Sequence, residues 1–385
     1  MDLTPSPQEE AFREKARAWL EANLPEPFEG EHTIEDPGYV PYLRVWQRKL
    51  AEGGWLGITW PTEFGGQGLG PVEQSIFNEE LAKAGAPNII GLVGVALIGP
   101  TIAMLGTPEQ KERYLRNILH GEEVWAQGFS EPNAGSDLGS LACRAVRDGD
   151  EFIVNGQKTW TSYAQASDWI FLLVRTDANV PKYKGITCLL VDMKTEGVSV
   201  RPLRMMSGDS AFNEVFFSDV RVPVENVLGE INGGWKVAIT ALMHERSNIG
   251  GGATVQLSRF LDEVIELARN RGLANDPVTR QKLAQAILEL DVYKMTSARA
   301  QSAVGKGQTP GPEGSILKMF WSNFNQSLVQ TALEIAGPYG QQTLGEYEPL
   351  TYQYLRSRGN SIEAGTTEVL KNTIANRVLG LPKSY

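Results

Sequence analysis

Glu245 and Arg246 stand side by side in a segment whose apolar residues recur at helical spacing. A step of about 100° per residue groups five of these apolar residues on one face of a helix that starts near residue 235: Trp235, Ala238, Ile239, Leu242 and Ile249. Glu245 falls within or beside this face, where desolvation raises the pKa of a carboxylate and makes it a stronger base once ionised. Such a base suits removal of a proton next to a carbonyl. From the pattern alone, a structural Glu–Arg pair or an edge carboxylate that points to water is the commoner explanation.

A second group of residues suits a flat cofactor that carries phosphate. A glycine-rich loop, QGFSEPNAGSDLGSL at residues 127–141, precedes NGQKTWTS at residues 155–162. Glycines let the backbone approach a ligand closely, and Ser130 and Ser136 supply hydroxyls. Trp160 offers an aromatic face beside two further hydroxyls, those of Thr161 and Ser162. A glycine-rich turn that leads into an ordinary hairpin accounts for the same letters about equally well.

The third group opens a helix near the C-terminus, where residues 365–368 read Gly-Thr-Thr-Glu. Free backbone N–H groups and hydroxyls at such a start can receive a phosphate or carbonyl oxygen. An ordinary N-cap explains Thr366 just as well. We predict that Leu370, Ile374 and Val378 form the buried stripe of this helix.

Three stretches of different pattern must position these groups. Residues 1–122 are typical of helices, residues 123–230 contain short runs of β type, and residues 231–385 return to helical periodicity. The predicted strands are 151–156, 169–176, 185–193, 198–203 and 214–222. The sequence therefore predicts an α+β multidomain fold, with a helical N-terminal domain, a central β domain and a C-terminal helical domain.

Composition narrows the function. The net charge of −10, from 36 basic and 46 acidic residues, argues against nucleic acid or an anionic membrane as the partner. Cys143 and Cys188 form no CxxC motif, and the three histidines are scattered without an HExxH motif. We therefore expect a reducing compartment and no metal site. The acidic N-terminus and the absence of an apolar run of about 18 residues predict a cytoplasmic protein without a membrane anchor.

Together these segments resemble the acyl-CoA dehydrogenase family over essentially the whole chain. The matching blocks are GFSEPNAGSD at 128–137, KTWTS at 158–162, AGTTEVLKNTIANRVLGLP at 364–382, FNEVFFSDVRVPVENVLG at 212–229 and LGITWPTEFGGQGLG at 56–70. The resemblance implies a β-barrel-like central domain and a C-terminal four-helix bundle, with FAD extended between them. It also implies α,β-dehydrogenation of an acyl-CoA thioester: a carboxylate removes the α-proton, and the β-hydrogen leaves as hydride to flavin N5.

The resemblance assigns roles to individual residues. Those that match flavin contacts are Phe129, Ser130, Ser136, Trp160, Thr161, Ser162, Thr366 and Glu368. Ser136 and Arg246 also match positions that border the acyl-CoA substrate. The backbone N–H of Ala364 is expected to help polarise the thioester carbonyl together with a flavin ribityl hydroxyl.

The catalytic base departs from the commonest pattern of the family. In most members the base immediately precedes the Gly-Thr of the C-terminal block, but Ala364 occupies that position and Glu363 stands one residue earlier. A minority branch, which includes isovaleryl-, long-chain and sterol side-chain-type members, carries the glutamate just before an arginine on a bundle helix. Glu245 matches that position, so we favour Glu245 over Glu363 as the base.

Contacts that relatives make across a subunit interface are also altered. The RxxFG motif, which reaches the FAD pyrophosphate of a neighbour, is missing, and Arg271 and Gln281 are the candidates to replace it. GGNG is replaced by GPYG at residues 337–340. We expect a homodimer or homotetramer, with a heteromer of related subunits as the alternative and electron-transfer flavoprotein as the electron acceptor.

Other functions fit the same fold. An acyl-CoA oxidase would pass its electrons to oxygen, and other flavoproteins of this fold carry out desulfination or nitroalkane oxidation. A partner subunit that completes the FAD site of another chain is the non-enzymatic alternative.

Overall fold

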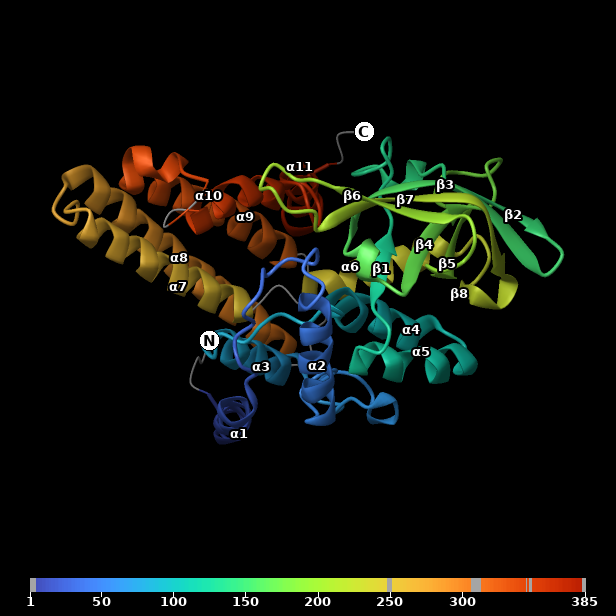
Figure 1. The fold of residues 1–385 in the computed structure, drawn as a ribbon, viewed down its shortest axis with the longest axis horizontal. Coiled ribbons are helices and arrows are strands. Elements are labelled where there is room, and N and C mark those ends of the chain that lie inside the picture. The colour runs from blue at the N-terminus through green and yellow to red at the C-terminus, as the bar shows by residue number, and fades with distance from the viewer. Residues whose placement is uncertain (1–4, 248–250, 306–312, 344, 346–347, 383–385) are drawn as a thin grey trace.

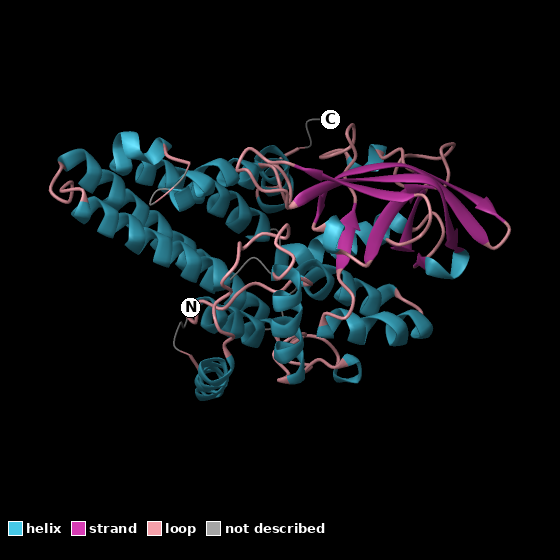
Figure 2. Ribbon diagram, in the orientation of Figure 1, coloured by secondary structure: helices cyan, strands magenta, loops and turns pink. Residues whose placement is uncertain are grey.

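The computed structural model describes residues 5–382 except 248–250, 306–312, 344 and 346–347. Figure 1 shows a twisted sheet at one end of the molecule, a helical bundle at the other, and the N-terminal helices along one side of both. The division into helix, strand and helix along the chain, which Figure 2 shows by colour, confirms the predicted fold class.

Five helices form the N-terminal part: α1 (Pro7–Asn23), α2 (Tyr39–Glu52), α3 (Pro71–Lys83), α4 (Gly99–Leu105) and α5 (Pro108–His120). Capping boxes start two of them, because Ser6 and Thr107 each accept a hydrogen bond from a backbone N–H three residues ahead. A Cβ added to Gly99 would lie 2.1 Å from the ring of Trp60, and one added to Gly91 would lie 2.6 Å from Gln47. Gly91 and Gly99 therefore permit close packing of the N-terminal helices.

The middle of the chain forms one sheet of eight strands: β1 (Trp125–Gly128), β2 (Arg144–Asp148), β3 (Glu151–Ser162), β4 (Trp169–Arg175), β5 (Ile186–Asp192), β6 (Val198–Leu203), β7 (Phe212–Pro223) and β8 (Val227–Leu228). The strand order is β6-β7-β3-β2-β4-β5-β8, and β1 pairs with β4. Four of the predicted runs match β4 to β7, and the run 151–156 covers only the first half of β3, which continues to Ser162. Strands β1, β2 and β8 are too short for a clear alternation.

The C-terminal part contains α6 (Gly234–Ser247), α7 (Gly251–Asn270), α8 (Pro277–Gly305), α9 (Glu313–Ala336), α10 (Glu348–Ser357) and α11 (Thr367–Thr373). Leucines and aromatic residues of α7, α8 and α9 share one core. None of the helices described is long and apolar enough to cross a bilayer.

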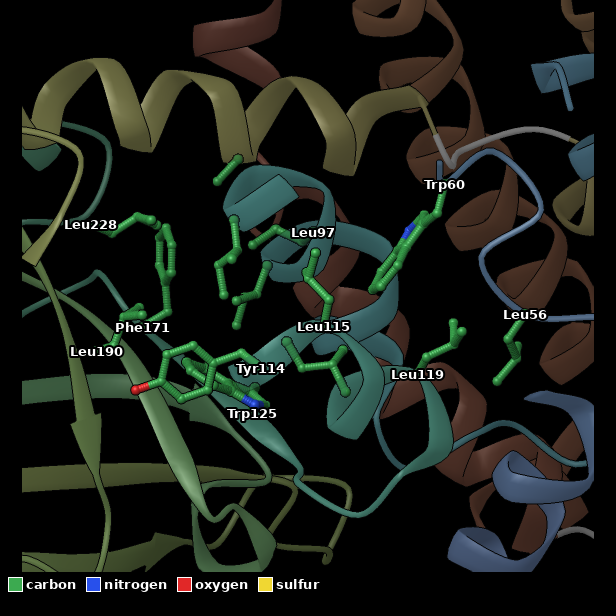
Figure 3. Packing of buried hydrophobic residues seen from close by; sticks show 14 of the residues in the cluster. Leu56, Trp60, Leu97, Tyr114, Leu115, Leu119, Trp125, Phe171, Leu190 and Leu228 are labelled. Carbon is green, nitrogen blue, oxygen red and sulfur yellow. The ribbon is translucent and has the colours of Figure 1, made fainter. Parts of the chain in front are cut away.

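Helix α6 belongs to a different core from α7, α8 and α9. Val237, Ala238 and Ala241 of α6 are buried in a cluster that joins the N-terminal helices to the sheet. Figure 3 shows this junction, where Tyr114 and Trp125 lie beside Phe171.

The predicted apolar face of α6 was wrong at one position. Ile239 is 41% exposed, because the buried stripe passes through residues 237, 238 and 241 rather than 239. Ile249 lies outside the described residues.

Candidate active site

A buried ion pair fixes the glycine-rich loop against β3. The side chain of Lys158 is fully buried, and its Nζ lies 2.7 Å from Oε1 of Glu131 and donates to the carbonyl oxygen of Phe129 at 3.0 Å. Glu131 also accepts hydrogen bonds from the backbone N–H groups of Ala142 (2.6 Å) and Cys143 (2.9 Å). Burial lowers the pKa of Lys158, while Cys143 and Glu131 act in the opposite direction.

Neither Lys158 nor Glu131 was among the predicted site residues. Both lie within blocks that resemble the family, at residues 158–162 and 128–137, but no local pattern links two residues 27 positions apart. The loop itself leaves β1, which pairs with β4, and it reaches β3 through a hydrogen bond from Thr159 N to Ser130 O of 2.9 Å.

Trp160 projects outward from a distorted part of β3. The register between β3 and β7 shifts between Lys158 and Thr161, and Trp160 has a φ of 58°, in the left-handed region that side chains rarely adopt. Its side chain is 61% exposed, and the Phe212 ring lies edge-on to it at a centroid distance of 6.0 Å. A strained backbone therefore presents a large aromatic face to the outside of the sheet.

Two buried polar atoms lie beside Trp160 without a hydrogen-bond partner in the described part of the chain. They are Oγ1 of Thr161 and Oδ1 of Asn213, which belong to residues paired across β3 and β7. A buried polar atom without a partner costs about 1–3 kcal/mol. A ligand that supplies hydrogen bonds at this edge removes that cost, and the polar edge of a flavin ring carries both donors and acceptors. The residues present therefore fit FAD.

The other residues predicted to contact the flavin, in the loop and at the end of β3, differ in how far they are buried. Phe129 is buried, and its ring packs against Phe171 at a centroid distance of 5.7 Å, so it contributes to the core. Ser130 and Ser162 are half-buried, whereas Ser136 is exposed. Serine hydroxyls that retain this exposure are free to meet a ligand.

The C-terminal turn contains two successive residues with positive φ, Ala364 (52°) and Gly365 (95°). Within the described residues, the backbone N–H groups of both lack a hydrogen-bond acceptor. Thr366 uses its hydroxyl to cap α11, accepting from Val369 N at 3.2 Å, and Glu368 is exposed. The N-cap interpretation of Thr366 therefore accounts for its side chain.

The predicted stripe of the last helix was wrong in its second half. Leu370 is buried, but Ile374 is only partly buried and Val378 is 42% exposed. Residues Ile374–Val378 form a π-helical turn, whose wider winding rotates the later side chains away from the core.

Glu363 is engaged on both carboxylate oxygens. Its Oε2 lies 2.8 Å from Nη2 of Arg356, and its Oε1 accepts from Nδ2 of Asn360 at 2.7 Å. Burial is the largest single influence on the pKa of Arg356 and would lower it, but the hydrogen bond and charge of Glu363, together with Tyr352 and Asp209, outweigh burial and raise that pKa. This arrangement makes Glu363 a structural carboxylate in the described geometry.

Arg356 also connects the turn to the sheet. Its guanidinium lies 5.7 Å from the centroid of the Phe212 ring, and Phe212 in turn contacts Trp160. On the neighbouring turn of α10, the Tyr352 hydroxyl donates to Asp209 at 3.3 Å. Arg356 and Phe212 therefore link the turn at Ala364 to the part of the sheet that carries Trp160.

Glu245 and Arg246 occupy the last turn of α6, one helical turn beyond Ala241, and their side chains lie outside the described residues. The preceding His244 is partly buried, and burial lowers its pKa.

Arg271 and Gln281 lie away from Trp160 and Ala364. Figure 1 places the turn between α7 and α8 at the end of the bundle remote from the sheet. There the Arg271 guanidinium stacks on Tyr339 of the GPYG segment at 4.8 Å, and Gln281 lines a surface groove between α8 and α9. Neither residue joins the site formed by its own chain.

Sequence models of three domains of one protein family match successive parts of this chain. The N-terminal domain of acyl-CoA dehydrogenases matches residues 6–122, the middle domain 126–220 and the C-terminal domain 232–379. Acyl-CoA dehydrogenase IpdE1 of Mycobacterium tuberculosis is 37% identical, over 97% of this chain and 98% of the relative.

Solved structures agree with this relationship. The Tcur3481-Tcur3483 steroid ACAD has a TM-score of 0.86 at 33% identity, with 100% of both chains covered. The ChsE4-ChsE5 complex from Mycobacterium tuberculosis has a TM-score of 0.84 at 32% identity, also over 100% of both chains. Members of the family bind FAD. The chain therefore belongs to the acyl-CoA dehydrogenase family and is an oxidoreductase of that type.

Proposed function

We propose that this chain carries out FAD-dependent α,β-dehydrogenation of a steroid-type acyl-CoA thioester, which yields the trans-2-enoyl-CoA. The observation that carries the proposal is the pair of buried polar atoms on Thr161 and Asn213 beside the exposed ring of Trp160. The steroid preference is supported by the description of a similar solved structure as a steroid ACAD.

We propose that FAD is contacted by β3 and the glycine-rich loop on one side and by the start of α11 on the other. Trp160, Thr161 and Ser162 would hold the flavin ring, and the loop from Phe129 to Ser136 would provide backbone and hydroxyl contacts, with Ser130 among them. Thr366 and Glu368 would contact the cofactor from the C-terminal wall. When bound, FAD accepts the β-hydrogen of the substrate as a hydride at N5.

Glu245 is the proposed base that removes the α-proton, and Ser136 and Arg246 border the thioester. The Ala364 N–H group, which has no acceptor in the described part of the chain, would donate to the thioester carbonyl oxygen. This hydrogen bond strengthens as negative charge develops on that oxygen, so it favours proton removal. The Arg356 and Asn360 contacts of Glu363 support Glu245 over Glu363.

We also propose that a neighbouring subunit takes part in FAD binding. Arg271 and Gln281 would contact FAD bound by a neighbouring subunit, because they lie remote from the site of their own chain. That neighbour is a second copy or a related chain, and the names of two similar structures each contain a pair of proteins. Electron-transfer flavoprotein is the proposed electron acceptor.

Anaerobic bleaching of the flavin tests this function. The purified chain is mixed with octanoyl-CoA, isovaleryl-CoA and the CoA thioester of a steroid C24 acid, and flavin absorbance is followed. We expect the steroid thioester to bleach the flavin fastest. Bleaching by none of the three would contradict dehydrogenation of these thioester classes, and rapid reoxidation by oxygen would indicate an oxidase.

The partner-subunit alternative makes a different prediction. A colourless chain that acquires FAD only with a second, related chain would show that the chain completes a shared site. The remote position of the turn between α7 and α8, which carries Arg271, is compatible both with this outcome and with a site shared by two copies of this chain.

A further inference from the structure

A buried lysine of the bundle closes the C-terminal turn. The Lys318 side chain on α9 is almost fully buried, and its Nζ donates to the carbonyl oxygens of Asn360 (2.6 Å) and Gly365 (2.9 Å). These two carbonyls lie on either side of residues 361–364 along the chain. A single side chain therefore fixes the distance between the two ends of the turn.

Further polar residues of α9 bind the same turn. Ser322 donates to the carbonyl oxygen of Asn360 at 2.7 Å, and Asn325 donates to its Oδ1 at 2.8 Å. Residues 318, 322 and 325 share one helix face, because they are spaced four and three apart. Asn360, which is buried, also donates to Glu363. One face of α9 is thus a polar support for residues 360–365.

The turn needs such a support because its backbone is strained. Ala364 has a Cβ yet adopts a positive φ of 52°, a conformation that persists only when surrounding contacts impose it. The same conformation leaves the N–H groups of Ala364 and Gly365 without an acceptor in the described part of the chain. A relaxed turn would redirect these groups.

We propose that Lys318 is a positioning residue, which holds the 360–365 turn so that the Ala364 N–H points at the thioester carbonyl oxygen. The proposal rests on the proposed function for the role of that N–H, and on the two carbonyl contacts for the clamp itself. Lys318 acts through the turn and makes no contact with the substrate.

The test compares Lys318→Met, Lys318→Arg and the control Lys371→Met in the FAD-bound protein. Lys371 is an exposed lysine on the adjacent α11. Hydrogen–deuterium exchange is measured for a peptide that covers residues 358–366 and for one within α7. Loss of both hydrogen bonds in Lys318→Met should speed exchange of the turn at least about tenfold and leave α7 unchanged.

Kinetics supply the second measurement, with the thioester of the three-member panel that bleaches the wild type fastest. Displacement of the Ala364 N–H should lower kcat by about 10²-fold in Lys318→Met, with KM within about threefold. Lys318→Arg should be intermediate, because a planar guanidinium cannot reproduce the two contacts of an amine. Lys371→Met should match the wild type in both measurements.

Each outcome decides the proposal. Exchange of the turn at the wild-type rate in Lys318→Met would overturn it, as would a rise in KM without a fall in kcat. If Lys318→Met does not fold, Lys318→Arg decides in the same way: faster exchange confined to the turn supports the clamp, and wild-type exchange refutes it. If no thioester bleaches the wild type, the proposed function fails, while the exchange measurement still tests the clamp.

Discussion

The sheet wall, which is the end of β3 that carries Trp160, and the C-terminal turn of residues 360–365 are held in place by different kinds of contact. Each presents a residue with positive φ to the site, Trp160 in one case and Ala364 in the other, and each depends on a buried lysine. Lys158 forms an ion pair with Glu131, within a strand that is hydrogen-bonded to neighbours on both sides. Lys318 instead donates to two backbone carbonyls, that of Asn360 in a short 3₁₀ helix (Arg358–Ser361) and that of Gly365 in the turn that follows it.

This difference predicts different sensitivities. The sheet wall has its geometry imposed by strand pairing, so loss of Lys158 should mainly reduce stability and release the loop. The turn has its geometry imposed by side chains of α9 and α10, so loss of those contacts should mainly misplace the Ala364 N–H group, for which we propose a role in binding the thioester carbonyl oxygen. Strand pairing therefore sets the backbone around Trp160, whereas side-chain packing sets the backbone around Ala364.

The largest expected effect is on stability, from Lys158→Met. The substitution leaves the Glu131 carboxylate buried without its cation, which should lower the free energy of unfolding by about 3–5 kcal/mol and weaken FAD retention. Chemical unfolding and flavin fluorescence measure the two effects. Glu80→Gln is the matched control, because Glu80 is a buried carboxylate held by cations in the N-terminal helices. Equal FAD loss in both variants would show that Lys158 has no particular relation to the loop.

Glu80, the residue changed in this control, should also make the stability of the fold depend on pH. Burial alone would raise the pKa of Glu80, but Lys83, Arg13 and Arg17 outweigh it and lower the pKa from 4.5 to about 2. A carboxyl group with a lowered pKa stabilises the fold above about pH 4.5, and this stabilisation is lost as the pH falls towards 2. Urea unfolding at pH 5 and pH 3 should show a larger loss for the wild type than for Glu80→Gln. Parallel losses would contradict the lowered pKa.

Trp160→Ala should affect the cofactor more than the fold. Loss of one exposed aromatic face should weaken FAD binding by about tenfold, the scale of one aromatic contact. The dissociation constant is measured by flavin fluorescence, with Trp160→Phe as a control that keeps a ring and should retain most of the affinity. Unchanged binding in Trp160→Ala would remove Trp160 from the flavin site.

The smallest expected effect comes from Arg356→Gln. The ion pair with Glu363 is partly exposed, so its loss should cost no more than about 1 kcal/mol of stability. It should still lower kcat several-fold, because Glu363 precedes Ala364 in the turn. A double-mutant cycle with Glu363→Gln measures the coupling, and additive effects on kcat would show that the pair does not position the turn.

Sequence patterns predicted the larger features because these depend on local periodicity. Strands β3 to β7 follow from alternating or continuously apolar runs, and the glycine-rich loop and Trp160 stand out by residue type. The contacts of Lys158 with Glu131 span 27 residues, and those of Lys318 with Asn360 span 42, so no local pattern reveals them. The π-helical turn that exposes Val378 also lacks a sequence signal of its own.

We propose that Glu245 removes the α-proton at a site to which Trp160 and Ala364 contribute. Anaerobic mixing of Glu245→Gln with the thioester that bleaches the wild type tests it directly. We predict FAD content and thioester binding close to the wild type and a bleaching rate lowered by at least about 10²-fold, the typical contribution of a general base. Bleaching at nearly the wild-type rate would contradict the claim and point to Glu363.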